Sequence, residues 1–175
     1  MTGGGGPVER FSRRGLPDRG RFRAATGVPT AALILGDASE AEDAVQDAMV
    51  RAWQRIGQVR EPARAGAWFG RLLVNVCRDR LRTRHSATVP WVAADPSRPA
   101  DEVATRDAVL RALAELPADQ RIAVVLRYYV DLSLQDIADR TQAPIGTVKT
   151  RLHYGLRALR ATYDAHDRGS EARDD

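Results

Sequence analysis

The chain has 175 residues, 43% of them hydrophobic, which is enough for one ordinary domain or two small ones. Its formal net charge is +4, and Lys149 is the one lysine among 27 basic residues; this bias towards arginine fits a nucleic-acid partner and, equally, a genome rich in G and C. A single cysteine excludes an intramolecular disulfide and a cysteine zinc cluster, and no apolar run reaches the ~20 residues of a membrane span.

The first 29 residues are rich in glycine, proline and arginine and contain no apolar core of a secretion signal. Gly27 and Pro29 interrupt the place where a helix would lead into the apolar run Ala31–Leu35, and a proline inside a helix costs about 3 kcal/mol or more. We therefore predict an irregular segment over residues 1–29, with at most a short helix around residues 21–26. The absence of a signal and the lone cysteine lead us to expect a cytoplasmic protein without membrane insertion.

A helix is predicted from Ser39, where Ser39 and Glu42 form a capping-box pattern, to about Ile56. Its spacing predicts a buried face of Val45, Met49, Ala52 and Ile56, with Trp53 at the margin. Asp47 and Arg51 have the spacing of an i,i+4 ion pair. Four carboxylates on this helix could bind a metal, but without a histidine beside them a solvated or protein-binding surface is favoured. These carboxylates are Glu40, Glu42, Asp43 and Asp47.

A second helix is predicted from Pro62 to Arg84, with an apolar stripe of Phe69, Leu72, Leu73 and Val76. Asn75, Arg78 and Arg82 share another side of this helix. Basic residues near a helix C-terminus bind phosphate or simply complement the helix dipole, and the sequence leaves both interpretations open. Residues 85–104 contain three prolines among serine, alanine and aspartate, so we predict a linker between two helical modules.

Two more helices are predicted after the linker. Val109, Leu113 and Leu116 define one that ends at Leu116–Pro117. The other begins near Asp119, and its buried face is predicted to contain Ile122, Val125, Leu126 and Tyr129.

The stretch from Ser133 to Arg160 has the pattern of a helix-turn-helix. Ser133 and Asp136 form a capping box, and Pro144 has the fixed φ that suits the first turn of a second helix. Val148, Leu152, Leu156 and Leu159 share one face of that helix, which leaves its polar and basic residues on the other faces. This geometry is typical of major-groove readers, although a plain helical hairpin with a solvated basic face is the alternative. We expect the polar tail after about Tyr163 to fray, and no further domain to follow it.

Three passages together resemble a bacterial RNA polymerase sigma factor of the extracytoplasmic-function (ECF) type. They are SEAEDAVQDAMVRAW (39–53), AWFGRLLVNVCRDRLR (67–82) and the stretch from Leu113 to Arg160. The resemblance implies an all-α fold of two small helical modules, a region 2-like one over residues 30–84 and a region 4-like one over residues 105–163. The 85–104 linker would join them, and residues 164–175 would form the tail.

The resemblance also implies roles for individual residues. The polymerase clamp would contact Asp43, Gln46, Asp47, Arg51 and Trp53. The −10 promoter element would contact Asn75, Arg78, Asp79 and Arg82, and a flipped-out base would lie near residues 58–64. The −35 element would contact Thr147, Lys149, Thr150, Arg151, His153 and Tyr154, with Pro144, Ile145 and Gly146 bringing the helix N-terminus close to a phosphate.

The partners implied by this resemblance are core RNA polymerase with its β and β′ subunits, promoter DNA and an anti-sigma factor. No cofactor, metal or enzymatic activity is expected. Three other interpretations are weaker: a stand-alone regulator that binds operators as a dimer, a recombinase or nuclease with a DNA-reading module, and a structural interaction protein. The regulator lacks an obvious sensor pocket, and an enzyme would need a nucleophile or metal cluster that the scattered histidines and serines do not supply.

Overall fold

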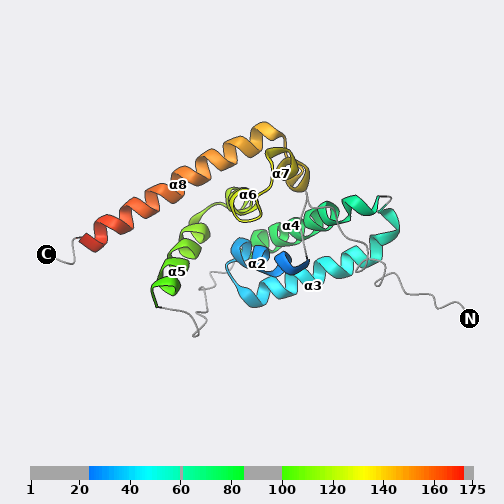
Figure 1. Ribbon diagram of the computed structural model, residues 1–175, viewed down its shortest axis with the longest axis horizontal. Helices are drawn as coiled ribbons and strands as arrows, with labels where there is room; N and C mark the ends of the chain where they lie inside the picture. The colour runs from blue at the N-terminus through cyan, green and yellow to red at the C-terminus, as the bar shows by residue number, and fades with distance from the viewer. Residues whose placement is uncertain (1–23, 60, 85–99, 172–175) are drawn as a thin grey trace, which may run out of the picture.

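The computed structural model describes residues 24–59, 61–84 and 100–171, and in these residues every regular element is a helix (Figure 1). The all-α prediction is confirmed. Two short 3-10 helices, Ile56–Gln58 and Pro62–Arg64, lie between α3 and α4. None of the helices in the described part of the chain is long and apolar enough to cross a membrane. The α-helices are α2 (Ala24–Leu35), α3 (Ala38–Arg55), α4 (Ala65–Arg84), α5 (Ala100–Glu115), α6 (Ala118–Tyr128), α7 (Leu134–Thr141) and α8 (Ile145–Glu171).

The first module is formed by α2, α3 and α4, which pack against one another. Small residues form the buried face of α3, since Ala41, Ala44 and Ala48 are fully buried and Val45 nearly so. Small side chains allow α2 and α4 to approach closely, with Ile34 in their shared core. The predicted burial of Val45 is confirmed, but that of Met49 is wrong, because the alanine face turns inward and Met49 is 55% exposed.

The predicted interruption at Gly27 and Pro29 is also wrong, because α2 runs through both residues from Ala24 to Leu35. Pro29 lies in the second turn, so it removes one backbone hydrogen bond near the start of a short helix. Thr30, Ala31 and Ile34 are completely buried against the rest of the module. Tertiary packing of this face therefore outweighs the local cost. The remainder of the predicted irregular segment, residues 1–23, lies outside the described residues.

The N-cap of α3 is Asp37 rather than the predicted Ser39. Asp37 has an extended backbone, and its Oδ1 accepts a hydrogen bond of 2.8 Å from the backbone N–H of Glu40. Gly36 directly before it has a φ of 75°, a left-handed conformation that glycine adopts without strain. This turn ends α2 and aims Asp37 at the first turn of α3, leaving Ser39 inside the helix.

The second module is built around α6, where Ile122 and Leu126 are fully buried. The predicted N-cap of α7 is confirmed, because the Ser133 hydroxyl accepts from the backbone N–H of Asp136 at 3.1 Å. The Asp136 carboxylate accepts in turn from the Ser133 hydroxyl at 2.6 Å. Gln142 is the C-cap of α7 and has a left-handed backbone conformation. The next helix, α8, begins at Ile145. At Gly155 a Cβ would lie 2.9 Å from Val124, so glycine permits the close approach of α8 to α6.

Two predicted boundaries differ from the structure. α5 begins at Ala100, inside the predicted 85–104 linker, and α8 continues to Glu171, past the predicted end near Tyr163. No proline or glycine lies between Ala100 and Leu116, or between Leu156 and Asp167, so nothing local stops either helix. The rest of the predicted linker, residues 85–99, lies outside the described residues.

The two modules contact each other, which the sequence did not indicate. α4 packs against α7, and α2 packs against α5 and α6 (Figure 1). Arg121, buried in α6, donates hydrogen bonds to the carbonyl oxygens of Ile34 at 3.0 Å and Leu116 at 3.1 Å. It also donates to the Ala114 carbonyl. One guanidinium thus serves the C-terminal ends of α2 and α5, where carbonyl groups lack helical partners.

Candidate nucleic-acid interface

The N-terminal half of α8 presents most of its predicted DNA-facing residues to solvent. Val148 is fully buried and Leu152 is 7% exposed, so one apolar edge of α8 packs onto the module. Burial of that edge fixes the helix rotation and turns the opposite faces outward. The exposed members of the predicted −35 set are Lys149, Thr150, His153 and Tyr154, while Thr147 and Arg151 are half-buried.

The N-terminus of α8 is also open. Pro144, Ile145 and Gly146 are exposed, and a Cβ built at Gly146 would meet nothing within 4 Å. The first backbone N–H groups of a helix have no helical partner and lie at the positive end of its dipole. This end is therefore open to solvent, and the phosphate contact predicted for it stays a prediction.

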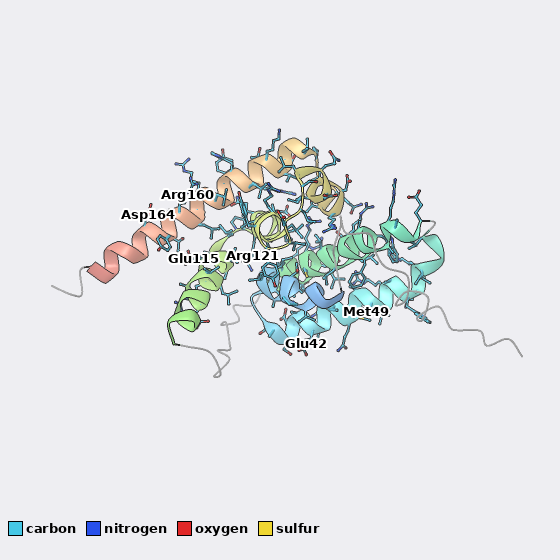
Figure 2. The ribbon with its side chains drawn as sticks, in the orientation of Figure 1. Glu42, Met49, Glu115, Arg121, Arg160 and Asp164 are labelled. Atoms are coloured by element: carbon cyan, nitrogen blue, oxygen red, sulfur yellow. The ribbon has the colours of Figure 1, made fainter. Side chains whose placement is uncertain are left out.

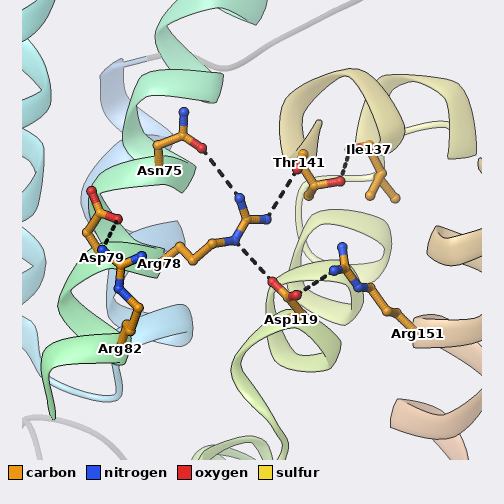
Figure 3. A network of polar contacts seen from close by, with 8 residues as sticks. All are labelled: Asn75, Arg78, Asp79, Arg82, Asp119, Ile137, Thr141 and Arg151. Atoms are coloured by element: carbon orange, nitrogen blue, oxygen red, sulfur yellow. Dashed lines mark hydrogen bonds and ion pairs between the residues drawn. The ribbon is translucent and has the colours of Figure 1, made fainter. Parts of the chain in front are cut away.

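The predicted −10 residues of α4 are arranged differently, because Arg78 is turned towards the second module (Figure 3). Its Nε lies 3.0 Å from Oδ1 of Asp119 on α6, and its Nη2 donates to the Thr141 carbonyl oxygen at 3.4 Å. Its Nη1 lies 3.5 Å from Oδ1 of Asn75. Asn75 and Arg78 are thus brought together, but in an intramolecular network.

The other two members of the −10 set pair on the surface of α4. Asp79 lies 3.4 Å from Arg82 and 3.9 Å from Arg51 of α3. The Arg82 side chain is 81% exposed, so it is the most accessible of the four. The 3-10 helix Pro62–Arg64 lies within the predicted base-capture loop, residues 58–64, and its Arg64 forms an exposed ion pair of 2.7 Å with Glu61.

Asp119 is the residue of this site that the sequence missed. Its Oδ2 also pairs with Nη2 of Arg151 on α8, so one carboxylate joins Arg78 and Arg151 (Figure 3). The sequence places Asp119 only at the start of a helix, where acidic residues are common. No local pattern signals partners that are 41 and 32 positions away.

The exposed side of α3 combines acidic and apolar residues (Figure 2). Met49, Val50 and Trp53 are each more than half exposed, and Trp53 is itself one of the predicted polymerase-binding residues. Exposed apolar side chains grouped in this way mark protein-docking surfaces. The predicted polymerase-binding residues are Asp43, Gln46, Asp47, Arg51 and Trp53, all of them exposed.

The predicted Asp47–Arg51 pair is replaced by two pairs between α3 and α4. Asp47 binds Arg80 at 2.6 Å, and Arg51 lies near Asp79. The hydrogen bond that Arg80 donates to Asp47 raises the pKa of Arg80, and the charges of Asp43 and Glu40 act in the same direction. The negative charge of the α3 carboxylates is thus partly neutralised by Arg80 of α4. In the described part of the chain, no three His, Cys, Asp or Glu side chains are grouped to hold a metal ion.

Comparisons with known proteins connect both modules to one family. The chain matches Sigma-70 region 2 over residues 28–87 and Sigma-70 region 4 over residues 106–159. It is 38% identical over 139 residues to the ECF RNA polymerase sigma factor SigL of Mycobacterium tuberculosis, across 74% of this chain and 77% of SigL. The chain belongs to the ECF family of RNA polymerase sigma factors.

Two further similarities support the same assignment. The ECF sigma factor SigW of Bacillus subtilis is 31% identical over 144 residues, which cover 73% of this sigma factor and 77% of SigW. The solved sigma factor RpoE of Bartonella quintana, in complex with the anti-sigma factor NepR, has a TM-score of 0.67 and 25% identity. That match covers 81% of this chain and 91% of RpoE. The chain is therefore a transcription-initiation factor, and the stand-alone regulator is not favoured because both sigma regions are present.

Proposed function

We propose that this sigma factor joins core RNA polymerase through the exposed side of α3 and selects promoters with α4 and α8. The observation that carries the proposal is the orientation of α8, whose Val148 and Leu152 are buried while its basic and polar residues face solvent. A helix held in this way in a helix-turn-helix can enter the major groove.

The proposed polymerase-binding surface consists of Asp43, Gln46, Asp47, Arg51 and Trp53, together with the exposed Met49. Apolar side chains at its centre would be removed from water on binding, and the carboxylates around them would favour a basic partner surface. The β′ clamp helices are the partner that the family resemblance implies for this surface.

The proposed −35 surface combines phosphate and base contacts. Lys149 and the open N-terminus of α8 would contact phosphates, whereas the exposed side chains of Thr150, His153 and Tyr154 would approach base edges. The −10 element would be held by Asn75, Arg78, Asp79 and Arg82, with residues 58–64 close to the flipped base. Removing a base from its stack costs a few kcal/mol, which contacts in this loop would offset.

This role needs no cofactor and no catalytic residue, so we propose a non-enzymatic factor that acts in the cytoplasm beside the polymerase. An anti-sigma factor is a further proposed partner, supported by the RpoE relative, which was solved in complex with NepR.

Reconstitution tests the proposal. The purified chain is mixed with core polymerase and a promoter library, and co-elution and transcription start sites are both measured. Trp53→Ala should weaken retention on core polymerase about tenfold or more, because buried tryptophans dominate interface energies. Tyr163→Ala is the control, since Tyr163 is 73% exposed but lies on α8, outside the proposed surface. A wild-type chain that neither joins the polymerase nor changes start sites overturns the proposal.

A further inference from the structure

The carboxylate of Asp119 lies between the two surfaces that are proposed to bind DNA. Arg78 from α4 approaches Oδ1 at 3.0 Å, and Arg151 from α8 binds Oδ2 (Figure 3). The exposed fractions of these side chains are 29% for Arg78, 23% for Arg151 and 40% for Asp119. Both arginines therefore face the boundary between the modules rather than open solvent.

Helix ends stabilise this arrangement from both sides. Asp119 lies in the first turn of α6, where the positive end of the helix dipole favours an anion. Arg78 also donates to the carbonyl oxygen of Thr141, the last residue of α7, where the dipole favours a cation. The ion pairs thus join α4 to the beginning of α6 and the end of α7.

This closed arrangement cannot read a complete promoter. Arg78 and Arg151 share a single carboxylate, so their guanidinium groups lie next to each other. The −10 and −35 elements are centred about 25 base pairs apart, which is roughly 85 Å along straight duplex DNA. The two arginines cannot reach both elements while Asp119 holds them together, so α4 and α8 must separate first.

We propose that Asp119 is an autoinhibitory latch that occupies Arg78 and Arg151 in the free chain and is displaced by promoter phosphate. The inference rests on the proposed function, because it assumes that Arg78 and Arg151 both contact promoter DNA. Phosphate competes directly, since it offers a guanidinium the same bidentate acceptor geometry as a carboxylate. Arg121 holds α2 to α6 on another side of the boundary, so opening would begin where α4 meets α7.

The first test measures the distance between α4 and α7 in the full chain. Spin labels are attached at Thr83→Cys and Gln135→Cys, both exposed, and pulsed electron paramagnetic resonance gives the distance distribution. The native Cys77 is fully buried and should not label. Asp119→Asn should lengthen and broaden the distribution, and high salt should move the wild type in the same direction because it screens partly exposed ion pairs.

Asp131→Asn is the matched control. Asp131 is exposed between α6 and α7 and has a left-handed backbone that asparagine tolerates, so the substitution removes the same charge but leaves the partners of Arg78 and Arg151 in place. If Asp119→Asn loses its helical circular dichroism, Arg78→Gln opens the same ion pair from the other side. An unchanged distance distribution in the folded variant overturns the latch.

The second test measures DNA binding by the full chain. Asp119→Asn should bind −35 duplex and −10 single-stranded oligonucleotides roughly three- to tenfold more tightly than wild type, as expected when two partly exposed ion pairs are released. A gain on the −35 duplex alone would mean that Asp119 acts only on Arg151, and would also overturn the latch. The proposed function is judged separately, by whether the wild-type chain joins core polymerase and selects start sites.

Discussion

α4 and α8 both present basic side chains that are predicted to meet promoter DNA, but they hold them in different states. On α8, Lys149, Thr150, His153 and Tyr154 are exposed on the side opposite the buried edge. On α4, Arg78 is engaged with Asp119, Thr141 and Asn75, and Arg82 is the accessible cation of the −10 set.

The difference follows from what each helix packs against. α8 contacts its own module with one apolar edge, so its polar faces stay in solvent. α4 is covered by α3 and α2 on one side and by α7 and α6 on another, which brings its basic residues into the boundary between modules. The exposed part of the proposed −35 surface is therefore preformed, and Arg151 is the member of it that Asp119 holds. The proposed −10 surface would have to exchange more of its intramolecular partners for DNA, because Arg78 has three of them.

The largest expected effects come from the buried edges that set this contrast. Leu73→Ala in α4 and Leu152→Ala in α8 should each lower the free energy of unfolding by about 2–5 kcal/mol, since each leaves a cavity. Met49→Ala should cost well under about 1 kcal/mol, because Met49 is exposed. Urea unfolding followed by circular dichroism measures all three. A large loss of unfolding free energy in Met49→Ala would instead support the buried face that the sequence predicted, with Met49 inside.

Lys149→Ala tests whether the exposed −35 surface contacts phosphate through Lys149. Loss of one phosphate contact should weaken −35 duplex binding roughly three- to tenfold across sequences and lower the salt slope by about 1. Fluorescence anisotropy at several salt concentrations gives both quantities. Arg111→Ala, an exposed change on α5, serves as the control. An unchanged slope for Lys149→Ala would remove Lys149 from the phosphate contacts.

A smaller effect distinguishes the two candidate caps of the first module. Asp37→Ala should destabilise the fold by about 1 kcal/mol, because the Glu40 N–H loses its acceptor. Ser39→Ala should be close to neutral, since Ser39 lies within α3. Thermal unfolding of both variants measures the difference, and a greater loss for Ser39→Ala would contradict the observed cap.

The smallest functional effect is expected at Cys77, which no proposed contact uses. Burial raises the pKa of its thiol to about 12, so the folded chain keeps the proton up to far higher pH than the unfolded chain. The thiol therefore favours the folded state below about pH 9, and this contribution is lost as the pH rises towards about 12. At pH 8, a thiol-reactive dye should label Cys77 only as fast as the first module opens. Rapid labelling of the native chain would contradict the tight packing of α4 around Cys77.

The sequence by itself determined the helices from α3 onward apart from some of their ends, the helix-turn-helix register and the family resemblance. These depend on spacings of a few residues: the Ser133–Asp136 capping box and the recurrence of Val148, Leu152 and Leu156 both act within one or two turns. The positions of Lys149, Thr150, His153 and Tyr154 on the outer side of α8 follow from the same periodicity, which is why that part of the predicted −35 set could be placed from the sequence.

Tertiary structure alone decided which of these faces are buried and which charges meet. Pro29 stays in α2 because its neighbours are packed, and Met49 is exposed because the alanine face of α3 is the one that fits against α2 and α4. Arg78 finds Asp119 across 41 positions and Arg121 finds Ile34 across 87. Such pairs arise only when separate helices pack, since no local spacing brings their atoms within reach.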